Sequence, residues 1–297
     1  MAGSLPIWGQ NYALTFYDNF KSPDWDKYPA ASATIKWWNW GQCCMTTTDG
    51  TSTQAYPDTV GVDPYAIGVN GMKTGLNIRL IEKDKTWVTG ILTSVDSTEN
   101  KGFTQTYGYF DIEARMSAGP ATWPAFSLQS IGSPNTEIDI EFYGSTPTLI
   151  YYTLHDKACE KSCAISQSQD WGLPNMTYGF HNYGLLWTPK TISFYFDEQL
   201  RWSTPTPWYF NIPMELILDN GIGNGQSTTG QASGADFQIE YVQVFKLPAT
   251  SAFTTAEDLA PSVPEAPTWA ATLSGFAILV LAGWRRTRTA VKRAQSL

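Results

Sequence analysis

The sequence predicts an all-β protein, and within that class a β-sandwich of the jelly-roll type formed by residues 5–248. Apolar and polar residues alternate with a period of two through much of this region, which is typical of strands that bury one face. Clusters of Gly, Pro, Asn and Asp separate the alternating segments, as turns require. No amphipathic helical pattern is visible before residue 268. Many strands in one domain of roughly 240 residues favour a sandwich or jelly roll.

The individual strands are predicted from this alternation. In residues 107–116, Phe110 and Ile112 share one face, and Asp111 and Glu113 share the other. One side of this strand is therefore expected to be buried. The same pattern predicts further strands at residues 76–80, 136–144, 149–154, 192–197, 214–218 and 237–245.

The C-terminal part of the chain differs in composition from the body. Residues 249–263 are rich in Ala, Ser, Thr and Pro, which is typical of a linker. Residues 266–284 contain no charged residue. A basic cluster follows directly, formed by Arg285, Arg286, Arg288, Lys292 and Arg293. We expect a C-terminal hydrophobic helix that spans a membrane, with the basic cluster on the cytoplasmic side; a buried helix is the alternative.

The segment 264–297 also matches a known kind of tail. Residues 263–270, VPEAPTWA, precede the apolar span. The order of a Pro-Glu element, an apolar span and an arginine cluster resembles the PEP-CTERM sorting tail of bacterial proteins, although Ala266 stands where proline is usual. The resemblance implies export to the cell envelope or the extracellular space, membrane association before processing, and an exosortase-type processing enzyme. The first residues, MAGSLPIWGQNYAL, show neither the basic nor the apolar region of a signal peptide.

Composition restricts the possible functions. The chain carries 19 basic and 27 acidic residues, a net charge of −8, which argues against nucleic acid as a partner. Aromatic residues make up 14% of the sequence, more than a core requires, and flat aromatic faces suit the apolar faces of sugars. With four Cys, two His and no CxxC pair, a structural zinc site is not expected. We expect a monomer that acts on a polysaccharide.

The most informative segment is TEIDIEFYG, residues 136–144. Glu137, Asp139 and Glu141 point to one face of a strand and the apolar residues between them to the other. Three acids on one face repel each other, so folding does not explain them; a solvated face or a cation site is the alternative to catalysis. Glycoside hydrolysis needs two carboxyl groups that flank the scissile bond.

The spacing of these acids suits that chemistry. Residues i and i+4 of a strand lie about 13 Å apart, so the side chains of Glu137 and Glu141 would lean toward each other over a concave sheet. Asp139 lies between them, and its charge would raise the pKa of a neighbouring glutamate and keep it protonated near neutral pH. Spacing alone does not say which glutamate is the nucleophile.

The EIDIE motif and its flanks closely resemble the active-site strand of glycoside hydrolase family 16. Further segments fall in the family's order, at residues 14–20, 107–128, 180–189, 192–197, 213–225 and 236–245. The resemblance implies a jelly roll with a concave substrate cleft, in which Glu137 is the nucleophile, Glu141 is the general acid/base and Asp139 assists. It implies an endo-acting, retaining hydrolase of a β-linked polysaccharide, a β-glucan or a galactan, that requires no cofactor for catalysis. The motif lacks the extra residue of many laminarinases, so it looks more like the lichenase and xyloglucan-transferase branch.

Further residues are candidates for binding the substrate or a metal. Trp123 lies in a Trp-Pro-Ala-Phe segment where the family places cleft aromatics. The full set of expected substrate contacts is Trp123, His155, Trp38, Trp40, Glu113 and Arg115. Core packing is the alternative for the tryptophans, a hydrogen-bonded structural role is the alternative for His155, and a mutual ion pair is the alternative for Glu113 and Arg115. Many family members bind one structural Ca²⁺, and Glu240 is the nearest match to its acidic ligand.

Two other functions are compatible with the same residues. A transglycosylase that remodels the producer's own exopolysaccharide would use the same carboxylates. A non-catalytic carbohydrate-binding surface protein would use the aromatic residues, but it would not need three acids on one strand face.

Overall fold

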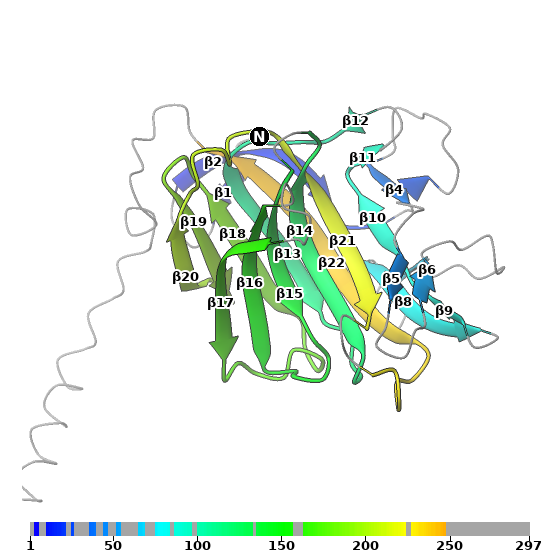
Figure 1. Ribbon diagram of the computed structural model, residues 1–297. Coiled ribbons are helices and arrows are strands. Elements are labelled where there is room, and N and C mark those ends of the chain that lie inside the picture. The colour runs from blue at the N-terminus through cyan, green and yellow to red at the C-terminus, as the bar shows by residue number, and fades with distance from the viewer. Residues whose placement is uncertain are drawn as a thin grey trace, which may run out of the picture. The chain divides into compact units, whose positions relative to one another are not determined.

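The computed structural model of the protein describes residues 3–5, 10–21, 25–26, 36–39, 44–46, 52–54, 65–68, 75–83, 86–96, 100–132, 135–156, 163–223 and 227–247 (Figure 1). Every helix or strand within those ranges is a β-strand, which confirms the predicted all-β class. In that part of the chain no helix is long and apolar enough to cross a membrane. The predicted linker, 249–263, and the predicted C-terminal helix and sorting tail, 264–297, lie outside the described residues.

The larger of the two main sheets has twelve strands. Its path runs through β20 (Gln199–Pro205), β19 (Thr191–Phe196), β18 (His181–Trp187), β13 (Gly108–Arg115), β22 (Ala235–Lys246), β8 (Leu76–Lys83), β9 (Thr86–Val88), β6 (Ser52–Gln54) and β5 (Cys44–Thr46). Beside this path lie β2 (Gln10–Asp18), which pairs with β22, β1 (Gly3–Leu5), which pairs with β2, and β7 (Tyr65–Ile67), which pairs with β8.

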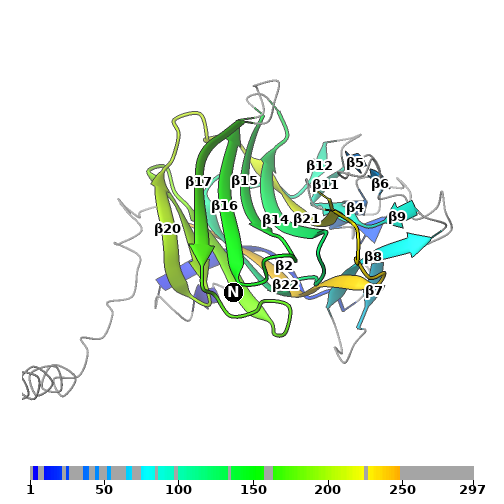
Figure 2. The same cartoon turned by 60° about the horizontal axis from the view of Figure 1, so that its bottom comes forward.

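The second main sheet has eight strands, and it carries the EIDIE motif. Its order is β17 (Cys163–Trp171), β16 (Leu149–Asp156), β15 (Thr136–Phe142), β14 (Thr122–Ser130), β21 (Met214–Ile222), β10 (Ile91–Thr93), β4 (Trp37–Asn39) and β3 (Trp25–Asp26). A small separate ladder joins β11 (Val95–Asp96) to β12 (Lys101–Gly102). Figure 2 shows β17, β16, β15 and β14 side by side, each bent along its length.

One apolar cluster joins the two sheets. It contains Ile138, Ile140 and Phe142 of β15 and Phe110 and Ile112 of β13, each at most 1% exposed. Burial of a side chain of this size contributes about 1.5–3 kcal/mol to folding, which fixes the inward face of each strand. The polar residues that alternate with them must therefore point away from the core, on the outer face of each sheet.

Two strands that were not predicted lie at the edges of the sheets. The sequences of β17 and β20 are largely polar, so they show no continuous buried face. An ion pair joins these edges, because Arg201 of β20 donates two hydrogen bonds to the carboxylate of Asp170 of β17, at 2.6 and 2.7 Å. The pair closes one side of the sandwich with polar groups.

Candidate active site

The acidic face is the outer face of the eight-stranded sheet around Glu137, Asp139 and Glu141. These acids point away from the core because the residues between them on β15 are buried in it. The antiparallel register then sets their neighbours. On β16, His155, Thr153 and Tyr151 lie opposite Glu137, Asp139 and Glu141, and on β14, Gln129, Ser127 and Ala125 lie opposite the same three acids.

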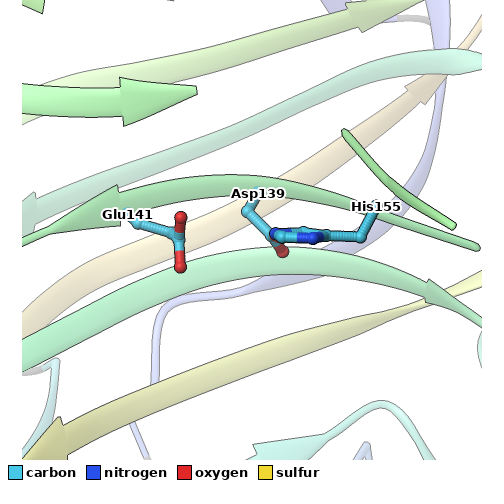
Figure 3. A group of neighbouring side chains, drawn as sticks. All are labelled: Asp139, Glu141 and His155. Atoms are coloured by element: carbon cyan, nitrogen blue, oxygen red, sulfur yellow. The ribbon is translucent and has the colours of Figure 1, made fainter. Parts of the chain in front are cut away.

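Asp139 is the most buried of the three acids, at 3% exposed. Its Oδ2 lies 3.2 Å from Nε2 of His155 (Figure 3). Burial raises the pKa of Asp139 to about 6, and the charge of Glu137 adds to the rise, while His155 opposes it. In return, the contact with Asp139 raises the pKa of His155. The imidazole is therefore favoured in its charged form beside the carboxylate.

Glu141 lies in a different environment, which favours its protonated form. Thr153 Oγ1 donates a hydrogen bond to Oε2 of Glu141 at 3.2 Å. Burial raises the pKa of Glu141 to about 7, and the charge of Asp139 adds to the rise, whereas His155, Thr153 and Trp123 oppose it. A carboxyl group with this pKa can donate a proton near neutral pH and take one up again.

Aromatic rings surround the Glu141 end of the acidic face. The rings of Trp123 and Tyr143 are stacked, with centroids 6.0 Å apart and planes 8° apart. Tyr143 also contacts Tyr151 edge-on, with centroids 5.0 Å apart. All three side chains are half-buried, so part of each ring is accessible next to Glu141. The Glu137 end instead has polar cross-strand neighbours, His155 and Gln129.

The structure places Trp123 and His155 on the acidic face, together with Trp38. Trp38 of β4 lies opposite Thr93 of β10, in the row that continues through β21 and β14 to Asp139. Four strand spacings separate it from Asp139, about 19 Å. Trp37 points the other way and is fully buried. Trp40 lies outside the described residues.

The structure corrects the prediction that Glu113 and Arg115 contact the same substrate. Both residues lie on β13, in the other sheet, and they point outward because Ile112 and Ala114 are buried in the core. Burial raises the pKa of Glu113, and the charges of Glu240 and Asp197 add to the rise. Arg115 lies over the ring of Phe180, at 5.9 Å from its centroid.

A metal could be held at two places. On β22, Glu240 lies close enough to Glu113 to affect its pKa, and hard carboxylate oxygens are ligands that Ca²⁺ prefers. The predicted calcium ligand Glu240 stays a prediction. On the acidic face, Asp139, Glu141 and His155 bring one ligand atom each to within 4.8 Å of one another, and this mixed set suits a borderline ion such as Zn²⁺.

Sequence reasoning missed one acid of this face. Asp219 of β21 lies opposite Ala125, which in turn lies opposite Glu141. The predicted strand ended at Leu218. The alternation that buries Leu216 and Leu218, continued by one residue, would have placed Asp219 on the outer face. The neighbouring sequence Asp219-Asn220-Gly221 is typical of a turn, and it obscured that signal.

Comparison with known proteins identifies the family. The model of the glycosyl hydrolases family 16 matches residues 72–243. The chain is 33% identical over 167 residues to the endo-1,3-1,4-beta-glycanase EglC of Rhizobium meliloti, covering 55% of this chain and 34% of that protein. It is 30% identical over 165 residues to a beta-glucanase of Rhodothermus marinus, covering 48% of this chain and 58% of that protein. The chain thus spans about a third to three-fifths of the length of these relatives.

Solved structures agree on the fold. A laminarinase from Rhodothermus marinus superimposes with a TM-score of 0.60 at 21% identity, covering 80% of this chain and 98% of that chain. A beta-glucanase of Bacillus licheniformis gives a TM-score of 0.59 at 16% identity, covering 78% of this chain and 98% of that one. The family model covers more than half of the sequence and includes the whole acidic strand. The chain belongs to the glycosyl hydrolases family 16.

Proposed function

We propose that the protein is an endo-acting, retaining glycoside hydrolase that cleaves a β-glucan. The observation that carries the proposal is the pair Glu137 and Glu141 on one strand face, with the pKa of Glu141 raised to about 7. A retaining glycosidase needs one carboxylate that attacks and one carboxyl group that first donates and then accepts a proton. The acidic face offers both groups on a rigid central strand.

In the first half of the reaction, Glu141 donates its proton to the glycosidic oxygen. The carboxylate of Glu137 attacks the anomeric carbon, the glycosidic bond breaks, and the leaving sugar departs as an alcohol. The product is a glycosyl ester on Glu137, while Glu141 is a carboxylate. Burial and the charge of Asp139 raise the pKa of Glu141, which keeps the proton available for this step.

In the second half, Glu141 acts as a base. It takes a proton from water as the water oxygen attacks the anomeric carbon, and Glu137 leaves as a carboxylate. Two inversions at the same carbon give net retention. The site is then restored, with a proton on Glu141 and a negative charge on Glu137.

The substrate class follows from the relatives and from the aromatic residues. Relatives are described as an endo-1,3-1,4-beta-glycanase and as beta-glucanases, which makes mixed-linkage β-glucan the first substrate to test. We infer that Trp123 and Trp38 offer flat faces to sugar rings, while His155 binds sugar hydroxyls. A galactan is a second candidate, because another relative is described as a keratan-sulfate endo-1,4-beta-galactosidase.

Product analysis tests this proposal. The purified chain and its Glu137→Gln variant would be incubated with mixed-linkage β-glucan, laminarin, xyloglucan, agarose and carrageenan, and the products identified by mass spectrometry. We expect oligosaccharides from a β-glucan with the wild type and none with the variant. Equal turnover by the variant would disprove the nucleophile. Binding of the polysaccharide without any turnover by the wild type would favour the carbohydrate-binding alternative.

Transglycosylation is a second candidate, because two relatives are described as xyloglucan endotransglucosylases. In that reaction, a sugar hydroxyl replaces water in the second half. The two outcomes are separated by product length at high acceptor concentration. Products longer than the donor would indicate transfer, whereas shorter products alone would indicate hydrolysis.

We further propose the cellular setting that the tail of the sequence predicts. Residues 264–297 would anchor the protein in the membrane until an exosortase-type enzyme processes it, and the catalytic part, a monomer, would act in the envelope or outside the cell. Mass determination of the mature protein tests this. A mature chain that still ends at Leu297 would argue against processing.

A further inference from the structure

The acidic face continues past the catalytic acids onto the edge strand of its sheet, β17, which lies next to β16 (Figure 2). Tyr151 and Thr153 of β16 belong to this face, because they lie opposite acids of β15. On their other side they lie opposite Gln169 and Gln167 of β17. Residues directly opposite one another share a face of the sheet. Both glutamines therefore lie on the acidic face, and both are exposed.

A side-chain contact confirms this placement of β17. Gln167 Nε2 donates a hydrogen bond to Thr153 Oγ1 at 3.5 Å, and Thr153 Oγ1 in turn donates to Oε2 of Glu141. Gln167, Thr153 and Asp139 form one row across the sheet. The Cα atoms of Gln167 and Asp139 are thus two strand spacings apart, about 10 Å. The edge strand is close enough to the catalytic acids for one bound chain to reach both.

Trp171, the last residue of β17, points to the same side. It lies two residues after Gln169 and opposite Leu149 of β16. Asp170 points the other way, because it accepts two hydrogen bonds from Arg201 of the other sheet. The indole of Trp171 is 63% exposed, so most of its apolar surface contributes nothing to the core. A large flat apolar surface is therefore accessible at the rim of the acidic face.

Trp171 extends an aromatic row along the Glu141 side of this face. Tyr143 follows β15 directly and Leu149 begins β16, so these two residues continue the ladder into the row of Trp171. The ring of Tyr143 stacks with that of Trp123 on β14. The row from Trp123 to Trp171 thus spans three strand spacings, about 14 Å. A sugar chain that crosses the strands would pass along this row.

We propose that Trp171, Gln169 and Gln167 form an outer subsite, the edge subsite, which binds a distal sugar unit of the same glucan chain. The inference rests on the proposed function, because it adds a contact to the same substrate. The indole offers a flat apolar face to the sugar ring. The two amides carry donors and acceptors for its hydroxyl groups. The occupant follows from continuity, since a chain that leaves the acids across β16 reaches β17 next.

The edge subsite has a consequence for specificity. It lies two strand spacings from the row of Asp139, so a short oligosaccharide held at the acids does not reach it. A longer chain fills it and gains binding free energy there. The protein should therefore prefer long chains, and this preference should depend on Trp171.

Four variants test the edge subsite. Trp171→Ala removes the indole, Trp171→Phe keeps an aromatic ring, and Gln169→Ala removes one amide. Tyr17→Ala is the matched control, because Tyr17 is also an exposed aromatic residue, at 44%, but lies on β2 of the other sheet. The constants kcat and KM would be measured on mixed-linkage gluco-oligosaccharides of increasing length.

We expect a loss that depends on chain length. Trp171→Ala should lower kcat/KM about tenfold on long chains, chiefly by raising KM, and change it less than about twofold on the shortest chain cleaved. Trp171→Phe should keep most of the preference for long chains, Gln169→Ala should reduce it about threefold, and Tyr17→Ala should match the wild type. A Trp171→Ala variant that equals the wild type on long chains would overturn the proposal. An equal loss at every length would also overturn it, because a structural defect affects all substrates alike.

A binding measurement separates this proposal from the proposed function. In the Glu137→Gln background, which should bind glucan without cleaving it, the Kd of a long gluco-oligosaccharide would be measured by isothermal titration calorimetry. Adding Trp171→Ala should raise that Kd about tenfold, and an unchanged Kd would overturn the edge subsite. A wild type that binds glucan without cleaving it would instead disprove the proposed function, and the binding series would still decide the role of Trp171.

Discussion

The outer faces of the two sheets can be compared directly, since each carries alternating acids on a central strand. These acids are Glu137, Asp139 and Glu141 on β15, and Asp111 and Glu113 on β13. Asp139 and Asp111 are each 3% exposed, and burial raises the pKa of each to about 6. Strand pattern, burial and pKa therefore do not distinguish the two faces.

The partners on neighbouring strands do distinguish them. Gln243 Nε2 donates to Oδ2 of Asp111 at 2.6 Å, and Asn182 and Tyr241 also lower the pKa of Asp111. These partners are neutral and hold a single buried charge. Asp139 instead lies between two glutamates and contacts His155, so the ionisation of one of these groups changes the pKa of the others. Alternating acids thus predict a half-buried strand, and the residues on the neighbouring strands decide whether its acids can transfer protons.

The largest expected effect comes from the same substitution on both faces. Glu141→Gln should lower kcat on β-glucan by about 10²–10⁴, the usual contribution of a general acid/base. Glu113→Gln should leave kcat within about twofold, although both glutamates are half-buried and burial raises the pKa of both. Initial rates of reducing-sugar release measure both. Equal losses in the two variants would mean that the face of β13 takes part in turnover.

A smaller effect is expected on the pH profile. The negative charge of Asp139 helps to raise the pKa of Glu141 to about 7, so Asp139→Asn should lower that pKa. The alkaline limb of kcat/KM should then move to lower pH by about one unit. Asp111→Asn, the matched variant on the other face, should leave the limb in place. An alkaline limb that stays fixed in Asp139→Asn would show that Asp139 does not act through its charge on Glu141.

Asp111 should instead affect stability. Its pKa is 3.8 ordinarily and about 6 in the folded protein, so the folded state binds more protons than the unfolded chain between these pH values. The free energy of unfolding therefore falls as the pH rises through that window, and the whole cost is present above it. Asp111→Asn removes the cost and should stabilise the protein at pH 8 by about 3 kcal/mol more than at pH 3.5. Urea unfolding at the two pH values measures this, and a gain that is the same at both would contradict the assignment.

The part of the fold that sequence could predict is the part with one buried face. Strands β13, β15 and β21 alternate clearly, and the structure confirms them. Strands β17 and β20 escaped prediction because edge strands bury little on either side. Within the site, the acids of β15 were visible because they share one strand. Asp219 was missed, and Glu113 was misplaced, because sheet membership depends on pairing between distant segments, which period-two alternation does not encode.

The smallest expected effect is on metal binding, and it separates the two faces by ligand type. Asp139, Glu141 and His155 combine a nitrogen with two carboxylates within 4.8 Å, so Zn²⁺ should inhibit turnover and EDTA should restore it. His155→Ala should weaken the inhibition relative to its own uninhibited rate. Ca²⁺ prefers carboxylate oxygens, so an ion bound at the predicted ligand Glu240 should leave turnover unchanged and raise Tm, and Glu240→Gln should abolish that rise. Zinc inhibition that is unaltered in His155→Ala would show that the imidazole is not a zinc ligand, and the two faces would then no longer be separated by a nitrogen ligand.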